Sequence, residues 1–212
     1  MRFYLIRHAQ TAWNVEGRAQ GHSDIPLDDM GKEQSDLLCN RLHQLSIDLV
    51  LTSDLQRARS TVENWCSRAG KKLEVRTELR ERNLGEFEGR PFAEFRDYFA
   101  NSSNDSDPFQ LDTRPPNGES IVDVWTRLQP LVRDLMDSDQ RVAVVTHGGT
   151  CGIVLAQFLR LEPIGARAFR FSNTGLTELE RHANGLWQLR RYNCTEHLEN
   201  PSLFGSLDGS FA

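Results

Sequence analysis

Short apolar segments that alternate with helical patterns constrain the fold of this chain more than any other feature of its sequence. Residues 2–6 and 141–146 read as buried strands, because they are rich in aliphatic, β-branched and aromatic side chains. Leucines at helical spacing follow residues 28–29, and a second helical pattern runs over about residues 55–69. This alternation predicts an α/β fold: a three-layer sandwich with a mainly parallel central sheet flanked by helices.

The rest of the chain extends this pattern. Further strands are expected at residues 48–52, 73–76, 169–171, 176–180 and 186–192, and further helices at residues 91–99, at residues 119–136, and after His147 as far as about Leu161. Residues 101–117 are rich in Ser, Asn, Asp and Pro, which indicates a surface loop. We therefore expect a single domain over residues 1–200 with a cap or lid insertion at about residues 85–120, followed by a flexible tail at residues 201–212.

The composition excludes several classes of partner. The chain has 212 residues and a formal net charge of −5, and its basic residues do not gather into runs, so we expect neither nucleic acid nor a membrane as a partner. No apolar stretch approaches the roughly 20 residues that a membrane-spanning helix needs. The widely spaced cysteines predict reduced thiols and a cytoplasmic location: they are Cys39, Cys66, Cys151 and Cys194.

Two of the strongest predicted strands end at a histidine. Residues 2–6 lead into Arg7 and His8, and residues 141–146 lead into His147. Because the carboxyl ends of parallel strands meet at one edge of a sheet, where ligands bind in such folds, both imidazoles are expected at that edge.

Arginines accompany these histidines. Arg7 precedes His8, and Arg57 lies where the strand at residues 48–52 gives way to the next helix. Two imidazoles and two guanidiniums match a dianionic phosphoryl group, because guanidiniums pair with its oxygens in bidentate fashion and helix N-termini favour anions. Each residue alone has an ordinary structural explanation, such as a hydrogen-bonded strand-end histidine or a solvated arginine. Their convergence on one edge favours an anion site.

A zinc site is the alternative that the same histidines allow. His8, His147 and a carboxylate are all common zinc ligands. Arg7 argues against this alternative, since a guanidinium beside a dication costs Coulomb energy. We therefore expect no metal and no other cofactor.

Five ordered motifs resemble the signature of the histidine phosphatase superfamily, which includes the cofactor-dependent phosphoglycerate mutases. They are LIRHAQTAWN at residues 5–14 with RAQG at 18–21, SDLQRA at 53–58, LRERNLGEFEG at 79–89, PNGES at 116–120 and VTHGG at 145–149. The resemblance implies a phosphoglycerate mutase-like sandwich over residues 1–200. It also implies a phosphatase of the histidine acid phosphatase type that passes through a phosphohistidine intermediate.

The resemblance further implies roles for single residues. His8 corresponds to the nucleophile, and Glu81 corresponds to the proton donor, with Glu86 as second candidate. The positions implied to bind the phosphoryl group or the substrate are Arg7, Asn14, Gln20, Gly21, Arg57, His147 and the backbone of Gly148.

The chemistry constrains the protonation of these groups. The attacking nitrogen of His8 must be unprotonated, and the nearby Arg7 and Arg57 disfavour an imidazolium there. The other ring nitrogen then needs an acceptor, often a backbone carbonyl, to fix the tautomer. Protonated His147 would serve best as a ligand of the phosphoryl oxygens. Glu81 must be protonated to release the alcohol and deprotonated to activate water.

The sequence departs from the commonest family motif at two positions. Ala9 stands where glycine is usual, and Gln10 where glutamate is usual. Neither side chain is expected to perform chemistry, but the methyl group of Ala9 narrows the backbone angles available behind His8.

The expected function is hydrolysis of a small phosphomonoester, such as a sugar phosphate, a phosphoglycerate or α-ribazole phosphate. A phosphoglycerate mutase is the first alternative; the interval from Glu81 to His147 is short for one and holds no adjacent arginine pair, which favours water as the acceptor. A catalytically silent module that binds phosphorylated partners is the second. A homodimer is compatible with the resemblance, but no residue pattern specifies the oligomeric state.

Overall fold

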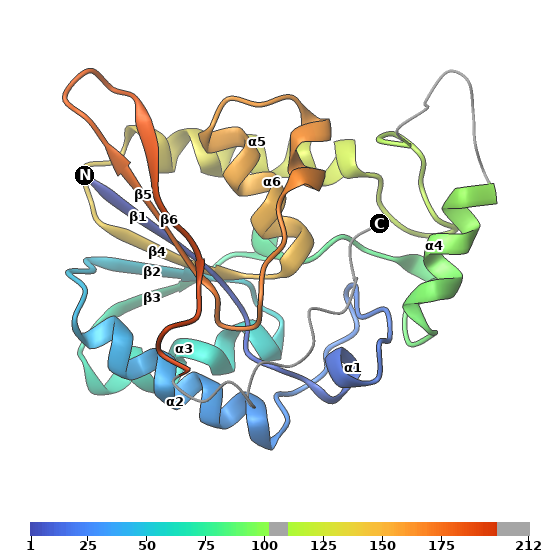
Figure 1. The fold of residues 1–212 in the computed structure, drawn as a ribbon, viewed down its shortest axis with the longest axis horizontal. Coiled ribbons are helices and arrows are strands. Elements are labelled where there is room, and N and C mark those ends of the chain that lie inside the picture. Colours follow the sequence, from blue (N-terminus) through green and yellow to red (C-terminus); the bar gives the residue numbers. More distant parts are fainter. Residues whose placement is uncertain (102–109, 199–212) are drawn as a thin grey trace.

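A six-stranded sheet with the order β3-β2-β4-β1-β5-β6 forms the centre of the molecule. In this computed structural model, residues 1–101 and 110–198 are described. β1 (Arg2–Arg7), β2 (Leu49–Thr52), β3 (Lys72–Val75) and β4 (Val142–Thr146) run parallel. β5 (Leu176–Arg181) and β6 (Trp187–Cys194) run antiparallel to their neighbours. Figure 1 shows this mainly parallel sheet between helical layers, so the predicted α/β sandwich is confirmed.

Side chains that alternate along the central strands divide the core into two layers. In β1, Phe3 and Leu5 face one cluster, whereas Tyr4 and Ile6 face the other. The neighbouring β4 alternates in the same way, which is why both strands read as continuous apolar runs in the sequence.

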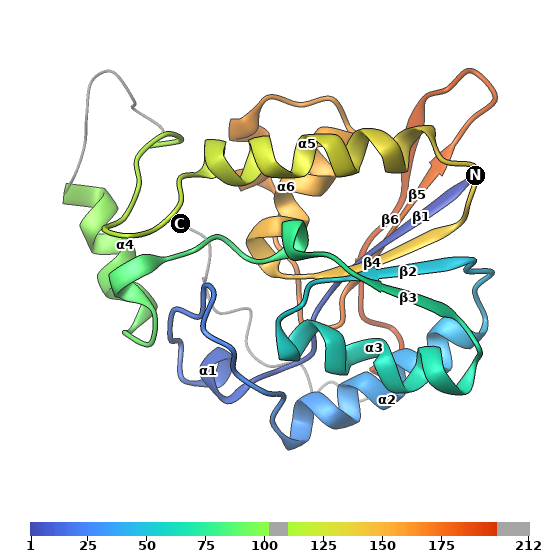
Figure 2. The ribbon, with the colours of Figure 1, turned by 180° about the vertical axis from the view of Figure 1, so that it is seen from behind.

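Helices cover both faces of the sheet. α2 (Asp29–His43) and α3 (Gln56–Arg68) pack on one face, and α5 (Ile121–Asp137) and α6 (Gly148–Phe158) pack on the other (Figure 2). The start of α2 is fixed by the Asp28 carboxylate, which accepts a hydrogen bond from the Gly31 amide at 2.7 Å.

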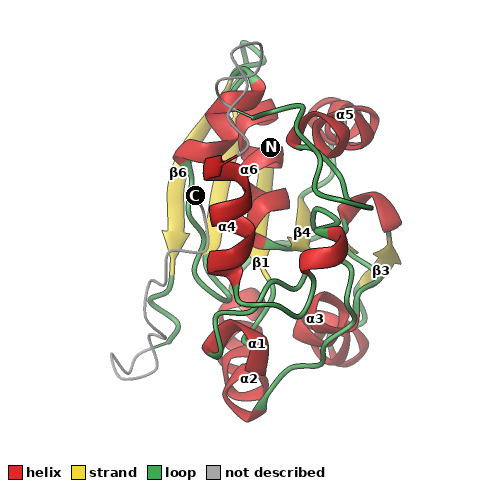
Figure 3. Cartoon of the chain, turned by 90° about the vertical axis from the view of Figure 1, so that its right-hand side faces the viewer, coloured by secondary structure: helices red, strands yellow, loops and turns green. Residues whose placement is uncertain are grey.

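The remaining elements are short. They are α1 (Ala12–Val15), η1 (Thr77–Leu79), η2 (Gly85–Phe87), α4 (Phe92–Asn101) and η3 (Pro163–Ala168). α4 stands at the edge of the sheet where β1 and β4 end, and Figure 3 views the molecule from this side. The predicted cap at residues 85–120 includes α4, and it stays a prediction because residues 102–109 lie outside the described residues. The predicted tail at residues 201–212 also lies outside them.

The prediction of a strand at residues 169–171 is wrong. Side chains, and not a neighbouring strand, bond three backbone groups of this segment. The hydroxyl of Tyr192 accepts from the amide of Arg170 and donates to its carbonyl. Arg7 donates to the carbonyl of Phe171 at 2.6 Å. The sequence pattern alone could not distinguish these two ways of pairing an extended backbone.

The antiparallel direction of β5 affects the site. The parallel strands end at the edge near α4, so β5 begins there, and residues 172–175 lie against Arg7 and His8. The Thr174 amide donates to the carbonyl of Arg7 at 3.1 Å, and the Arg7 amide donates to the carbonyl of Gly175 at 3.4 Å.

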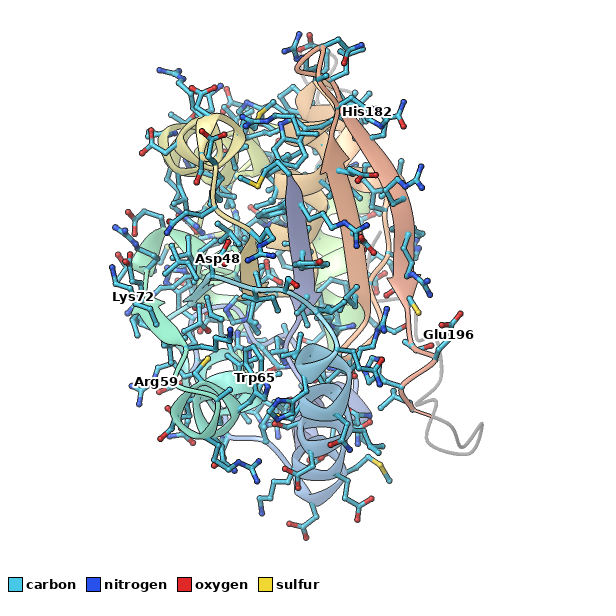
Figure 4. All side chains as sticks on the ribbon, turned by 90° about the vertical axis from the view of Figure 1, so that its left-hand side faces the viewer. Asp48, Arg59, Trp65, Lys72, His182 and Glu196 are labelled. Atoms are coloured by element: carbon cyan, nitrogen blue, oxygen red, sulfur yellow. The ribbon has the colours of Figure 1, made fainter. Side chains whose placement is uncertain are left out.

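The side of the molecule opposite α4 is shown in Figure 4. On this side Asp48 forms an ion pair with Arg141 (Nη2–Oδ1 2.6 Å), close to the N-terminal ends of the parallel strands. Within the described residues, no helix is long and apolar enough to cross a membrane.

Gly31 allows α2 to approach the loop that follows His8. A Cβ atom built at Gly31 would lie 2.0 Å from the carbonyl oxygen of Gln10. Alanine would normally favour a helix by about 1 kcal/mol over glycine. Here we expect the opposite: Gly31→Ala should lower the free energy of unfolding by roughly 1–3 kcal/mol, since the loop must shift. Chemical denaturation checks this, with the neighbouring exposed Lys32→Ala as control. An unchanged or raised stability of Gly31→Ala would contradict the close approach.

Candidate active site

A cavity of about 540 Å³ opens at the carboxyl edge of the parallel strands. Eight of the nine residues predicted for the site line it: Arg7, His8, Asn14, Gln20, Gly21, Arg57, Glu81 and Gly148. The ninth, His147, is buried behind the described lining residues and next to His8, with ring centroids 5.2 Å apart.

His8 is held in one tautomer. Its Nδ1 lies 2.7 Å from the carbonyl oxygen of Ala9, which accepts a hydrogen bond from the protonated nitrogen. This leaves the lone pair on Nε2, the nitrogen that can attack phosphorus. The pKa of His8 lies well below its usual value because burial, Arg57 and Arg7 all disfavour the imidazolium, in that order.

The backbone of His8 is fixed as firmly as its ring. Asn173 donates from its side-chain amide to the His8 carbonyl at 2.9 Å, and the His8 amide donates to the Thr146 carbonyl at 2.8 Å. The backbone of His8 is therefore held at the end of β1 from both its amide and its carbonyl.

Arg57 is fully buried and joins three parts of the site. It donates to the carbonyls of Ser23 (Nη1, 2.7 Å) and Gly21 (Nη2, 2.8 Å), and its Nε donates to Nδ1 of His147 at 3.2 Å. These bonds use three of the five N–H groups of a guanidinium, so two remain for a ligand. Burial lowers the pKa of Arg57 to about 10, against the opposing charge of Glu81.

His147 differs from the expectation of a protonated ligand. Its Nδ1 accepts the bond from Arg57, and its Nε2 lies 2.9 Å from the hydroxyl of Ser53. Burial and the charge of Arg57 hold the pKa of His147 well below its usual value. The ring is therefore neutral here, and it positions Arg57.

Asn14 and Gln20 are tied to each other through Thr11. Oδ1 of Asn14 accepts a hydrogen bond from the Thr11 amide at 3.1 Å, and Oε1 of Gln20 accepts one from the Thr11 hydroxyl at 3.1 Å. With both oxygens occupied, the side-chain amide groups are the polar ends left for an anion in the cavity.

Glu81 lies at the N-terminus of α6. Its carboxylate accepts hydrogen bonds from the amides of Gly149 (2.9 Å) and Thr150 (3.2 Å), and from its neighbour Arg82 (2.9 Å). A Cβ atom at Gly149 would lie 2.7 Å from this carboxylate, so any larger residue there would displace the carboxylate from its present position.

The backbone of Glu81 is held by a second set of contacts. Arg127 donates to the Glu81 carbonyl at 3.0 Å and pairs with Glu119 (Nε–Oε1 3.0 Å). Nε2 of His22 lies 2.9 Å from the same carbonyl. Glu119 belongs to the PNGES motif, so this motif helps to position the backbone of Glu81 through Arg127.

Neither neighbouring carboxylate has a comparable position. Glu86 is exposed and accepts from the side chain of Asn117 at 3.1 Å. Glu88 accepts from the His22 amide (2.7 Å) and the Ser23 hydroxyl (2.7 Å). The geometry therefore favours Glu81 over Glu86 as the proton donor.

The two departures from the family motif fit without strain. Ala9 is buried, its backbone is outside the left-handed region, and its amide donates to Thr61 at 2.9 Å. Gln10 donates from its side chain to Asp28 at 3.1 Å, which ties the loop after His8 to the start of α2.

The sequence pattern does not identify several residues of the site. Ser53 lies in the SDLQRA motif, but the resemblance implies no role for it, although its hydroxyl contacts His147. Asn173 contacts the His8 carbonyl only because β5 runs antiparallel and begins at this edge of the sheet. Other cationic residues line the outer part of the cavity: Arg18, Arg82, Arg96 and Arg167. They come from separate segments of the chain, including α4 and η3, so their convergence could not be derived from spacing.

Within residues 1–101 and 110–198, no group of three or more His, Cys, Asp or Glu side chains is placed to hold a metal ion.

Comparison with known proteins decides the family. The family model described as "Histidine phosphatase superfamily (branch 1)" matches residues 3–195. The chain belongs to the histidine phosphatase superfamily.

Sequence relatives are named as phosphoglycerate mutases or mutase-like proteins. The phosphoglycerate mutase-like protein 4 of Arabidopsis thaliana is 32% identical and aligns over 95% of this chain and 89% of its own length. A probable phosphoglycerate mutase of Yersinia enterocolitica is 28% identical, over 96% of this chain and 97% of its own.

Several similar solved structures are named as phosphatases. A mycobacterial glucosyl-3-phosphoglycerate phosphatase superposes with a TM-score of 0.77 at 30% identity, covering 92% of this chain and 99% of its own. The α-ribazole phosphatase of Shigella flexneri superposes with a TM-score of 0.79 at 27% identity, covering 92% of this chain and 96% of its own.

The buried neutral imidazoles predict how stability depends on pH. The folded-state pKa values of His8 and His147 are depressed, so between pH 6.5 and 5 the unfolded chain binds more protons. The free energy of unfolding should therefore fall as the pH falls through this window, by up to about 1.4 kcal/mol per pH unit for each histidine. Denaturation at several pH values checks this, and His147→Gln should show a shallower slope. A stability that is constant or rises on acidification would contradict the neutral pair.

Proposed function

We propose that this protein is a metal-independent phosphomonoesterase that forms a phosphohistidine at His8. The observation that carries the proposal is the fixed tautomer of His8, whose Nδ1 is bonded to the Ala9 carbonyl in a cavity that Arg7 and Arg57 also line. The phosphatase names of the similar structures support hydrolysis.

The first step transfers the phosphoryl group to the enzyme. Nε2 of His8 forms a bond to phosphorus while the bond from phosphorus to the ester oxygen breaks, and Glu81 gives its proton to the departing alcohol. In the second step Glu81 takes a proton from water as the water oxygen attacks phosphorus. The P–N bond breaks, phosphate leaves, and His8 returns to its neutral form.

The other residues stabilise the charge on the transferring oxygens. Arg7 and Arg57 supply cationic N–H donors to the cavity beside His8, and His147 orients Arg57 by accepting the bond from its Nε. Asn14, Gln20, Gly21 and Gly148 complete the lining at this end. Removing one such donor typically costs on the order of 10²–10³ in rate.

Phosphoglycerate mutase activity is the second candidate, because the sequence relatives carry that name. The short interval between Glu81 and His147 favours water as the acceptor. A catalytically silent binding module is a third reading, opposed by the presence of both His8 and Glu81 in one cavity. We further propose a cytoplasmic protein, acting as a monomer or homodimer on small phosphorylated metabolites.

The activity assay separates these functions. Incubated with a panel of phosphomonoesters that includes 3-phosphoglycerate, the protein should release inorganic phosphate, form little 2-phosphoglycerate, and keep its activity in a chelator. Rapid quenching should trap acid-labile phosphate on His8. His8→Ala should lose turnover and labelling by at least about 10³-fold. Full turnover by His8→Ala, or loss of activity in the chelator, would contradict the mechanism.

The choice of proton donor has a matched pair of variants. Glu81→Gln removes the proton that the leaving alcohol needs, so kcat for substrates with poor leaving groups should fall by about 10²–10⁴-fold. Glu86→Gln, an exposed change nearby, should lie within a factor of about three of the native chain. Comparable losses in the two variants, or a larger loss in Glu86→Gln, would remove Glu81 from its role.

A further inference from the structure

The turn at residues 20–23 holds the guanidinium of Arg57. The Ser23 amide closes this turn by donating to the Gln20 carbonyl at 3.0 Å. The carbonyl oxygens of Gly21 and Ser23 accept the hydrogen bonds from the two terminal nitrogens of Arg57. Each terminal nitrogen keeps one further N–H group, and the position of the turn sets the direction in which these two groups point.

Glu88 holds the turn in place through its carboxylate. Its Oε1 accepts from the His22 amide at 2.7 Å, and its Oε2 accepts from the Ser23 hydroxyl at 2.7 Å. Oε1 also accepts from the Leu84 amide at 3.2 Å, so the carboxylate joins the turn to the segment that follows Glu81. Hydrogen bonds to an ionised acceptor are roughly twice as strong as those between neutral groups, so Glu88 is a firm anchor for the turn.

Gly21 leaves the space that this carboxylate occupies. Its φ angle is +50°, in the left-handed region that favours glycine. A Cβ atom built at Gly21 would lie 2.1 Å from Oε1 of Glu88. The backbone of the turn and the carboxylate therefore fit closely against each other, and a change in the length of the Glu88 side chain must move the turn.

Asp24 fixes the other end of the turn. Its Oδ1 accepts from the amide of Gln56 at 2.6 Å, at the first residue of α3, the helix that carries Arg57. The turn is thus bound to α3 at one end and to Glu88 along its length. Burial lowers the pKa of Arg57, and the charges of both carboxylates act against this shift, less strongly than the charge of Glu81.

We propose that Glu88 is a positioning residue for phosphoryl transfer, which aims the free N–H groups of Arg57 at the phosphoryl group through the turn at residues 20–23. The inference rests on the proposed function, in which Arg57 binds the transferring oxygens. Glu88 is not among the described residues that line the cavity, so it acts on the reaction through Arg57 and not by contact with the substrate.

Two substitutions of Glu88 separate the reach of its side chain from its charge. Glu88→Gln keeps the length: the new carbonyl oxygen can accept from the His22 amide, and the new NH2 group can donate to the Ser23 hydroxyl. Glu88→Asp keeps the charge but is one methylene shorter, which withdraws the carboxylate from the turn. The control is Glu63→Asp, the same change at a surface carboxylate of α3 that pairs with Arg59 (Nη2–Oε2 3.4 Å).

The Nε–H signal of Arg57 in ¹⁵N-labelled protein reports the position of the guanidinium without turnover. Its bond to Nδ1 of His147 should protect this hydrogen from exchange with solvent, and the loss of the signal in Arg57→Lys assigns it. Exchange should become at least about tenfold faster in Glu88→Asp. Glu88→Gln and Glu63→Asp should keep the native protection.

Orthovanadate binding measures the consequence for the site, because bound vanadate takes the five-coordinate geometry of the transferring phosphoryl group. Calorimetry should show binding about tenfold weaker in Glu88→Asp, and within about threefold of the native chain in the other two variants. With a phosphomonoester, kcat of Glu88→Asp should fall by a similar factor while KM changes less than about threefold.

Two results would overturn the inference. One is a Glu88→Asp variant with a native Arg57 signal and native vanadate affinity, even if its free energy of unfolding is lower, since that is the result of a merely structural role. The other is a loss in Glu88→Gln as large as that in Glu88→Asp, which would assign the effect to the charge of Glu88.

The outcome is separable from that of the proposed function, because the Arg57 signal requires no substrate. A faster exchange in Glu88→Asp, in a protein whose native chain releases no phosphate, would contradict the phosphatase alone. Phosphate release by the native chain, with Glu88→Asp native in every measurement, would contradict the role of Glu88 alone.

Discussion

The buried guanidinium of Arg57 is the interaction on which the site depends. It carries a positive charge where His8 and His147 are both shielded from water, and it holds the loop at Gly21 and Ser23 to the end of β4 through three hydrogen bonds. Burial, together with this charge, holds the pKa of both imidazoles well below its usual value and keeps them neutral. In the proposed mechanism, Arg57 would therefore both help to keep Nε2 of His8 unprotonated and bind the phosphoryl group.

A second constraint is the way in which backbone groups fix the reactive side chains. His8 donates to the Ala9 carbonyl, and Glu81 is held by the amides that begin α6. Because backbone groups move only with their strand or helix, both side chains inherit the rigidity of the sheet. Gly31 and Gly149 permit this closeness, since a methyl group at either would collide with the loop after His8 or with the Glu81 carboxylate.

Much of this arrangement follows from the sequence. The continuous apolar runs at residues 2–6 and 141–146 predict parallel strands that end at His8 and His147. The predicted phosphoryl ligands meet at one edge because parallel strands share it. The failures have physical causes. Residues 169–171 have strand composition, but Tyr192 and Arg7 satisfy their backbone. The neutral state of His147 depends on the approach of Arg57 and Ser53, and the convergence of Arg82, Arg96 and Arg167 on the cavity depends on the packing of α4 against η2 and on the position of η3. Neither is encoded in local spacing.

The account is tested most directly by the tautomer of His8. In ¹⁵N-labelled protein near pH 7, NMR correlations assigned with a His8 variant should show a protonated Nδ1 and an unprotonated Nε2 on a neutral ring. A protonated Nε2, or an imidazolium at this pH, would place the lone pair out of reach of phosphorus and contradict the central claim.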